Sequence, residues 1–475
     1  MKKVWKYLIL TILLLLGLCC VGVLYLFFVP GSSLFNITYI YKSKTIEKTE
    51  SVENVNKVVL NTRGYNVNIF QTDKEDISLK VYANSFGFTL KQHKEATLTT
   101  NFKDNILTLT IDEPYGFATK NNSYINLYLP TSNAFDLTLN NKSAKTKIDA
   151  EDLVIYNLTY KTESGDCSLN NAYVLSDIVI NSKDGDFKVG EKVKTNNNNV
   201  FLSLNSALFE AKTSSFNNVS ILKNNRGVVK INSCNSITEK ITNAGGQIYI
   251  NKAKNVNIVT SGTDLYFDEI LDGAFIDMSK SGDINITKLY GPSTLSTKTG
   301  KINIGTAYSA ITTTTDTGNI NIGSAYLKIT AKTNYGDVNI NFAEDASSIN
   351  ENSNSRKLEA TLKNGKINAT GVENISLTIT DNARAIISMK NVLGANKIIG
   401  NRGNINVTVE KTANYVLKTE TKKGKVRVNL SQIVEYNGYT TKTERVTNVN
   451  CETSQNSLTV STINGNLTIL DTNFA

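Results

Sequence analysis

The chain has 475 residues, 40% of them hydrophobic, with 21 tyrosines and 17 phenylalanines but only four prolines. This composition excludes a largely disordered chain, because disordered segments are poor in aromatic and β-branched residues. Five cysteines in a chain of this length exclude a disulfide framework. The net charge of +9 is spread thinly and accompanies no recognisable basic and aromatic module, so we expect no nucleic-acid partner.

The N-terminal residues predict a membrane anchor. Three lysines fall within residues 1–6, and the uncharged run over residues 7–29 is long enough to cross a hydrocarbon core of about 30 Å as a helix. The run exceeds the apolar region of a cleaved signal peptide, and the lysines before it place residues 1–6 in the cytoplasm. We therefore expect a single-pass cell-membrane protein with a linker over residues 30–44 and an extracytoplasmic C-terminal domain.

Residues 45–140 are predicted to form an N-terminal β region. Apolar and polar residues alternate over 77–82, 105–111 and 124–129, which is the period of a half-buried strand. These runs are longer than those of the later repeats. The region is expected to be either a cap or a set of wider coils.

A short repeat dominates the central part of the chain. Three consecutive copies begin at Gly282, Gly300 and Gly318, which is an 18-residue period, and each reads glycine, any residue, Ile-Asn-Ile. A short fixed period is typical of a solenoid. A looser form of the pattern, with turn glycines that include Gly336, predicts a regular β-solenoid over residues 141–430 with about 18–21 residues per coil. Residues 431–475 are expected to form C-terminal coils and a cap over the open edge.

One coil follows from simple stereochemistry. Glycine is expected to supply a positive-φ corner, after which Ile284 and Ile286 face the interior while Asn285 faces outward. Stacking then places isoleucine on isoleucine and asparagine on asparagine, as in cross-β ladders. The fold class is therefore all-β. Parallel crossovers are usually right-handed, so we predict a right-handed parallel β-helix; the left-handed type fits an 18-residue coil but lacks support from hexapeptide spacing.

Several segments resemble a known family. The segment Ile125-Asn126-Leu127-Tyr128-Leu129-Pro130 and the turns at 163–166 and 281–284, after an N-terminal anchor, are similar to the bacterial “putative adhesin” family, a domain of unknown function built of β-strand repeats. The resemblance covers roughly residues 50–470. It implies an envelope protein with a β-solenoid, and it brings no catalytic residues to carry over.

The sequence predicts no enzyme, no metal site and no cofactor. Its one histidine, His93, lies in a polar run between lysines, where an exposed linker residue is the simpler interpretation. The best enzymatic alternative is a polysaccharide hydrolase or lyase, because four turn glycines precede an aspartate. These aspartates are Asp166, Asp186, Asp283 and Asp337. The same column also contains Lys301, which suits a surface charge ladder better than a pair of catalytic carboxylates.

A column of tyrosines is the candidate ligand-contact strip. Tyr290, Tyr308 and Tyr326 recur at the 18-residue period. If they point outward, they form an amphipathic strip for a sugar polymer or a protein; if they point inward, they form an aromatic stack in the core, which is the favoured interpretation. Residues Thr312 to Thr315 are expected to reflect β-propensity on a solvated face.

These observations predict a membrane-anchored envelope protein that binds without catalysis. The expected partners are the membrane and an anionic wall polymer, a glycan or a surface protein, since a basic outer domain is attracted to anionic polymers. A structural spacer or self-assembling scaffold is the alternative.

Overall fold

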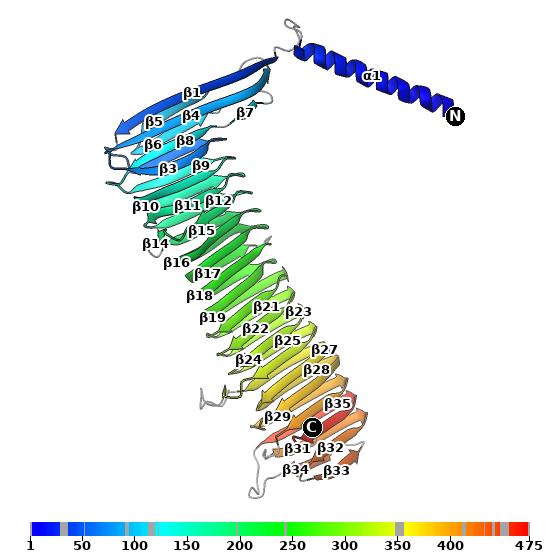
Figure 1. Cartoon of the computed structure of the whole chain (residues 1–475). Helices are drawn as coiled ribbons and strands as arrows, with labels where there is room; N and C mark the ends of the chain where they lie inside the picture. The colour runs from blue at the N-terminus through cyan, green and yellow to red at the C-terminus, as the bar shows by residue number, and fades with distance from the viewer. Residues whose placement is uncertain are drawn as a thin grey trace. The chain divides into compact units, whose positions relative to one another are not determined.

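The computed structural model describes most of the chain. The described residues are 2–28, 37–51, 53–90, 95–112, 119–121, 123–195, 198–241, 245–346, 356–410, 415–431, 433–438, 442–446 and 456–473. Within them the fold is all-β apart from one helix, α1 (Lys2–Phe28) (Figure 1). The all-β prediction is therefore confirmed. The chain forms two compact units, the first comprising Met1–Leu175 with Asp184–Asp186 and Lys192–Lys194, and the second the remainder.

Helix α1 covers the predicted anchor. Its described side chains between Ile9 and Gly22 are exposed on every face of the helix, and most of them are aliphatic. In the part of the chain that the structure describes, none of the helices has the length and apolar character needed to cross a membrane. The anchor therefore stays a prediction.

The first unit combines parallel coils with antiparallel strands. Its strands are β1 (Ile37–Ser51), β2 (Lys57–Thr62), β3 (Asn66–Thr72), β4 (Asp76–Leu90), β5 (Thr97–Lys103), β6 (Ile106–Asp112), β7 (Thr119–Asn121), β8 (Tyr124–Pro130), β9 (Phe135–Asn141), β10 (Thr146–Thr162) and β11 (Cys167–Val174). Strand β2 lies between β6 and β9, and β3 lies between β8 and β10, all in parallel. Strand β5 then pairs with β6 in antiparallel fashion, while β4 pairs with β8 and β1 pairs with β4, also antiparallel. The outer edge is thus closed by antiparallel strands.

The strands of the second unit before its central coils are short at first and then long. From Asp177 they are β12 (Asp177–Ser182), β13 (Phe187–Val189), β14 (Lys194–Thr195), β15 (Asn199–Leu204), β16 (Leu208–Asn224), β17 (Val228–Ile241), β18 (Gln247–Thr260) and β19 (Asp264–Ser281). Strands β16 to β19 each pair in parallel with the next along nearly their whole length. Each of these long strands therefore supplies one complete coil.

The central coils stack in the predicted register. Each has two strands, so that β20 (Ile284–Leu289) and β21 (Ser293–Thr299) are followed by β22 (Ile302–Ala307) and β23 (Ile311–Thr317), then by β24 (Ile320–Ala325) and β25 (Ile329–Tyr335). Ile284 pairs with Ile302 and Ile302 with Ile320, and all three are buried. The predicted stacking of isoleucine on isoleucine is confirmed, and these coils form a β-solenoid-like fold.

The corner glycines are required chiefly by close approach between coils. A Cβ atom on Gly300, Gly318 or Gly336 would lie 2.1, 1.9 and 1.9 Å from the carbonyl oxygen of the glycine one coil earlier, which no side chain can tolerate. The predicted positive φ is found at Gly282 and Gly318, at 154° and 158°, but not at Gly300 or Gly336. The expectation that every corner needs glycine for its backbone conformation was therefore wrong. The close approach between neighbouring coils requires glycine at each of these corners.

Buried threonines complete the corners. The side chains of Thr297, Thr315 and Thr333 are buried and donate to the carbonyl oxygens of the glycines one coil earlier at 3.1, 3.3 and 3.4 Å. Thr313 is also buried. The expectation of a solvated threonine face over 312–315 is thus wrong for two of the four residues, because strand alternation turns them inward.

The core of the second unit places the carboxyl of Glu239 among aliphatic residues. Glu239 lies in register between Ile221 and Ile258 and has no exposed surface. Burial raises the pKa of Glu239 to about 7, and the Thr263 hydroxyl lowers it by a smaller amount. The two described cysteines outside α1, Cys167 and Cys234, are buried free thiols, and burial raises their pKa values.

The C-terminal coils do not stack in chain order. After β26 (Val338–Phe342), the strands are β27 (Lys357–Val372), β28 (Asn374–Met389), β29 (Ala395–Arg402), β30 (Ile405–Val409), β31 (Tyr415–Lys423), β32 (Val426–Leu430), β33 (Ile433–Gly438), β34 (Lys442–Val446), β35 (Ser457–Asn464) and β36 (Leu467–Asp471). Strand β35 lies between β29 and β31, and β36 lies between β30 and β32. Antiparallel β33 and β34 then pair with β32 and β31. The last coil of the sequence is therefore the penultimate coil of the stack.

Candidate binding face

One outer surface of the second unit collects the features that suit binding. We define the binding face as the outward surface of β20, β22 and β24 together with the outward side chains at the start of β19. Across each strand it presents an asparagine, then a small residue, then a hydroxyl or lysine, and finally the corner tyrosine. Because the coils are in register, each of these positions forms a column along the stack.

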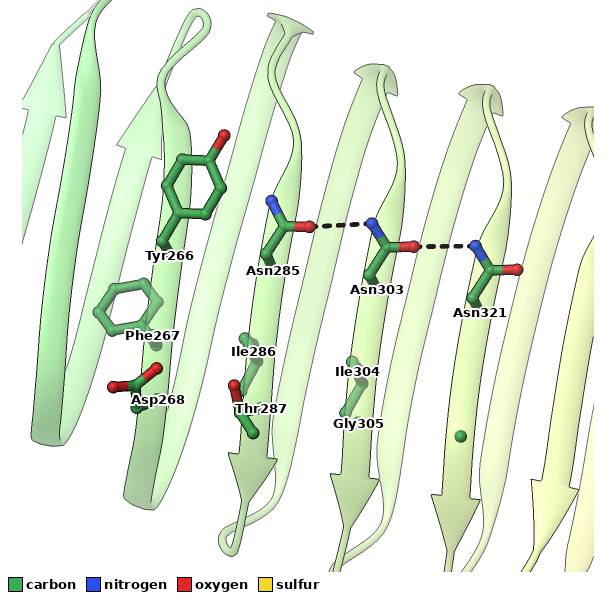
Figure 2. Close-up of a pocket in the computed structure, with 11 residues that line it drawn as sticks. Tyr266, Phe267, Asp268, Asn285, Ile286, Thr287, Asn303, Ile304, Gly305 and Asn321 are labelled. Atoms are coloured by element: carbon green, nitrogen blue, oxygen red, sulfur yellow. Dashed lines mark hydrogen bonds between the residues drawn. The ribbon is translucent and has the colours of Figure 1, made fainter.

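The asparagine column is a continuous hydrogen-bonded ladder. Each Nδ2 donates to the Oδ1 one coil earlier, from Asn303 to Asn285 at 2.9 Å and from Asn321 to Asn303 at 2.8 Å (Figure 2). Asn339 and Asn368 continue it at 2.9 and 2.8 Å. The predicted asparagine ladder is confirmed, and it fixes the amide orientation on five successive coils.

Stacked aromatic rings extend the asparagine column in the N-terminal direction. Tyr266 is in register with Asn285, and its ring is parallel to that of Tyr249, with centroids 4.5 Å apart. Lys230 places its Nζ 5.8 Å from the centroid of Tyr249, within the range of a cation–π contact. Burial is the main cause that raises the pKa of the Tyr266 hydroxyl, so this ring stays neutral over the physiological range.

A trough runs beside the ladder. Its floor includes Gly305 and Gly323, which are exposed and have no side chain, and its volume is about 470 Å³. Thr287 and Asp268 lie in line with these glycines at its N-terminal side, and Figure 2 shows Tyr266 on the same strand as Asp268. Because Gly305 and Gly323 have no side chain, the backbone of two coils is accessible between the asparagine ladder and the columns that lead to the tyrosines.

The tyrosine strip, which we define as Tyr290, Tyr308 and Tyr326, lies at the surface. The ring centroids are 4.7 and 5.0 Å apart, with interplanar angles of 5° and 16°. Tyr290 is 37% exposed, and the other two are half-buried. The favoured prediction of a core stack was therefore wrong: the corner after Leu289 turns these rings outward. The rings still stack on one another, so it is their edges that lie at the surface.

The charges near the binding face are mostly paired. Glu269 accepts from the Nζ of Lys288 at 3.0 Å, and this hydrogen bond is the main cause that lowers the pKa of the carboxyl and raises that of the amine. Burial, followed by the Asp345 carboxylate, raises the pKa of the Tyr326 hydroxyl. The face therefore offers amides, hydroxyls and aromatic edges, with little free positive charge.

The aspartates after the turn glycines have a structural role. Asp283 Oδ1 accepts the backbone N–H of Lys301 at 2.8 Å, and Asp337 Oδ1 accepts that of Lys366 at 2.9 Å. Asp166 does the same for the backbone N–H of Asp186 at 3.1 Å in the first unit. These carboxylates satisfy corner N–H groups one coil later, which accounts for an acidic or amide residue at this position without catalysis.

No cluster of metal-ligating residues occurs in the described ranges. His93 lies outside the described residues. Sequence reasoning identified the tyrosines and asparagines of the face but missed Gly305, Gly323, Tyr266 and Asp268. The two glycines carried a usable signal, since they recur at the 18-residue period; the other two residues belong to a coil without the repeat.

Two parallel strands per coil, stacked in register, define a β-solenoid-like protein. The sequence model of the Toastrack DUF4097 family matches residues 55–368, and the chain belongs to this family. This confirms the resemblance to the adhesin-like domains of unknown function. Comparison with curated proteins gives no match.

Solved structures with low similarity carry related descriptions. A “putative cell adhesion protein” from Clostridium sporogenes is 11% identical with a TM-score of 0.16, and the alignment covers 90% of this chain and 100% of that one. A “putative adhesin” from Bacteroides fragilis is 11% identical with a TM-score of 0.16, covering 90% and 97%. Another from Parabacteroides distasonis is 10% identical with a TM-score of 0.18, covering 72% and 93%.

Proposed function

We propose that the protein is a membrane-tethered envelope protein whose binding face holds an extended polymer or surface partner without catalysis. The observation that carries this proposal is the tyrosine strip, in which three stacked rings on consecutive coils place their edges at the surface. Tyrosine offers a large contact area and a polar hydroxyl at a small entropic cost. A ligand with a repeating structure would meet the same group on every coil.

The tether is supported by the N-terminal residues. Aliphatic side chains such as Leu13 and Leu16 are exposed on all faces of α1, and a helix that is apolar all round requires an apolar environment. Lysines 2, 3 and 6 precede it, which favours a cytoplasmic N-terminus and an outward-facing remainder. We further propose that the coils wind in the right-handed sense, as parallel crossovers usually do.

Non-enzymatic action is supported by the use of the corner carboxylates. Asp283 and Asp337 each accept a backbone hydrogen bond from the next coil with Oδ1, so one oxygen of each carboxylate is used by the scaffold. A glycoside hydrolase needs two carboxylates poised on either side of the scissile bond. The described residues of the binding face bring only Asp268 into the trough.

Binding by the tyrosine strip is tested with the full chain in detergent micelles. Co-sedimentation with isolated bacterial cell walls is measured for the native protein, for the double variant Tyr308→Ala/Tyr326→Ala and for the matched control Tyr335→Ala. Tyr335 is exposed but lies on β25, away from the binding face. We expect the double variant alone to lose binding.

Three outcomes would count against the proposal. Equal binding by the double variant would remove the tyrosine strip from the function, and absence of binding by the native chain would favour a structural spacer. Release of soluble sugars from the walls by the native protein would instead favour a polysaccharide enzyme.

A further inference from the structure

We infer that the trough binds a linear, uncharged polysaccharide that lies along the stack with about one sugar ring per coil. This inference rests on the proposed function, and it specifies the chemistry of the ligand. It uses the part of the binding face between the asparagine ladder and the tyrosine strip, which includes Gly305 and Gly323.

The repeat distance supports a polymer that lies parallel to the stack. Neighbouring coils are separated by about 4.8 Å, as paired strands are. The ring spacings of 4.7 and 5.0 Å in the tyrosine strip have the same repeat. An extended chain of pyranose rings advances by a similar distance per ring, so successive sugars can meet equivalent groups. A polypeptide strand in this direction would not keep that register.

The ladder leaves a regular set of hydrogen-bonding groups. A side-chain amide has two N–H donors and two acceptor lone pairs. Within the ladder, Asn303 donates one N–H to Asn285 and accepts one from Asn321. One donor and one lone pair therefore remain on this half-buried rung, and the same holds for Asn321. Such paired donors and acceptors, fixed in direction, match the hydroxyl groups of a sugar.

The shape of the trough admits a chain of rings. Gly305 and Gly323 give two consecutive coils a floor without side chains, whereas Thr287 rises at its N-terminal side. The tyrosine strip borders the face at the C-terminal ends of β20, β22 and β24. A flat sugar can therefore contact the backbone floor while its hydroxyls meet the ladder.

The charges favour an uncharged ligand. The described residues that line the trough include one carboxylate, Asp268, and no cation. Lys288 is paired with Glu269 at 3.0 Å, and Lys328, beyond the tyrosine strip, is paired with Glu359 at 2.7 Å. The net charge of +9 of the whole chain is thus not concentrated at the binding face. An anionic polymer would meet Asp268 without a free cation to compensate it.

The test measures binding of the full chain, in detergent micelles, to defined oligosaccharides by isothermal titration calorimetry. The neutral probes are linear β-1,4-linked glucan, mannan and chitin oligosaccharides, and the anionic probes are oligogalacturonate and teichoic acid. We expect at least one neutral probe to bind, with an affinity that does not change with ionic strength, because no counterions are released. Anionic probes should bind more weakly.

Two pairs of variants locate the site. Thr287→Trp fills the trough, and its control Thr317→Trp adds the same side chain at an exposed position on β23. Asn321→Leu removes a rung of the ladder, and its control Asn334→Leu breaks the similar Asn334–Asp316 bond of 2.9 Å between β25 and β23. Each trough variant should bind about tenfold more weakly, a loss of roughly 1.4 kcal/mol, while the controls bind as the native chain does.

The outcomes separate this inference from the proposed function. Preferential, salt-sensitive binding of an anionic probe that still depends on Tyr308 and Tyr326 would overturn the neutral ligand and leave the binding function intact. Unchanged binding by Thr287→Trp and Asn321→Leu would overturn the location. Failure of every probe, and of cell walls, would overturn both.

Discussion

The central coils and the C-terminal coils of the second unit obey different rules of chain order. Between Ile284 and Val338, each coil pairs with the coil that directly precedes it in the sequence. At the C-terminus, β35 and β36 insert between two coils that are consecutive in the sequence. In the first unit, β2 and β3 likewise lie between strands that come later in the chain. The central coils are thus built by pairing between neighbours in the sequence, whereas the end regions depend on pairing between segments that are distant in the sequence.

Two deletions of similar length test this difference between the central and the C-terminal coils most directly. Removal of residues 457–475 takes away β35 and β36, the strands with which β31 and β32 pair in parallel, whereas β29 and β30 keep their pairing with β28. We expect the free energy of local opening of residues 415–430 to fall to near zero. Removal of residues 302–319 should be tolerated, because Ile284 would then meet Ile320 as it now meets Ile302.

Hydrogen exchange with mass spectrometry measures both deletions on the same peptides. Loss of protection over residues 415–430 in the C-terminal deletion alone would support the distinction. Equal loss in both deletions would show that the central coils are not interchangeable units.

A substitution at the corner of a central coil tests the close approach between neighbouring coils. In Gly318→Val, the added Cβ would meet the Gly300 carbonyl oxygen at 1.9 Å, so the coils must separate. We expect a loss of about 4 kcal/mol in the free energy of unfolding. Lys301→Ala, at the neighbouring exposed position of the preceding corner, should change it by about 0.5 kcal/mol or less. Urea unfolding followed by circular dichroism compares them, and equal midpoints would contradict the close-approach argument.

A substitution of Glu239 tests the effect of a buried carboxyl within a column of aliphatic side chains. The pKa of Glu239 is about 7 in the folded protein against an ordinary value of 4.5, so the unfolded chain releases this proton at lower pH. The contribution of Glu239 to stability is therefore full below pH 4.5 and falls as the pH rises to about 7, by about 3 kcal/mol. Glu239→Gln should remove this contribution, which is measured as the difference between the two proteins in urea titrations at successive pH values. A difference that does not change with pH would contradict burial as the cause.

The smallest expected effect comes from the corner threonines. Thr315→Val keeps the shape of the side chain but removes the hydroxyl that donates to the Gly300 carbonyl oxygen at 3.3 Å. The free energy of unfolding should fall by about 1 kcal/mol. Thr312→Val, at a half-buried position of the same strand, is the control and should be nearly neutral. A larger effect at Thr312 would show that β-propensity, and not the corner bond, explains the threonines.

Sequence periodicity was sufficient to predict the contacts that repeat from one coil to the next. The positions of Ile302, Asn303 and Gly300 follow from the equivalent residues of the neighbouring coils, because identical coils place identical residues over one another. The insertion of β35 carried no such signal, since its partners lie more than one coil away in the sequence, as the pairs Ala395–Ser457 and Val416–Ser457 define. Non-local pairing depends on the whole stack and not on a local pattern.

The binding face was predictable to a similar degree. Tyr308 and Asn303 were evident as repeats, but the outward turn of the tyrosines depends on a corner whose geometry alternation does not determine. The trough was missed because its defining feature is an absent side chain at Gly305 and Gly323. A periodic glycine outside the turn position is thus a signal for a groove as well as for a corner.

The asparagine ladder crosses an irregular interval without distortion. The step from Asn339 to Asn368 spans 29 residues instead of 18, yet its hydrogen bond is 2.8 Å, like those of the regular coils. The chain after Phe342 can therefore change in length while the adjoining rungs keep their positions. Foreign peptides could be grafted between residues 346 and 356 to display them on this scaffold, and the amides of Asn339 and Asn368 on the flanking strands would report whether the host had been disturbed.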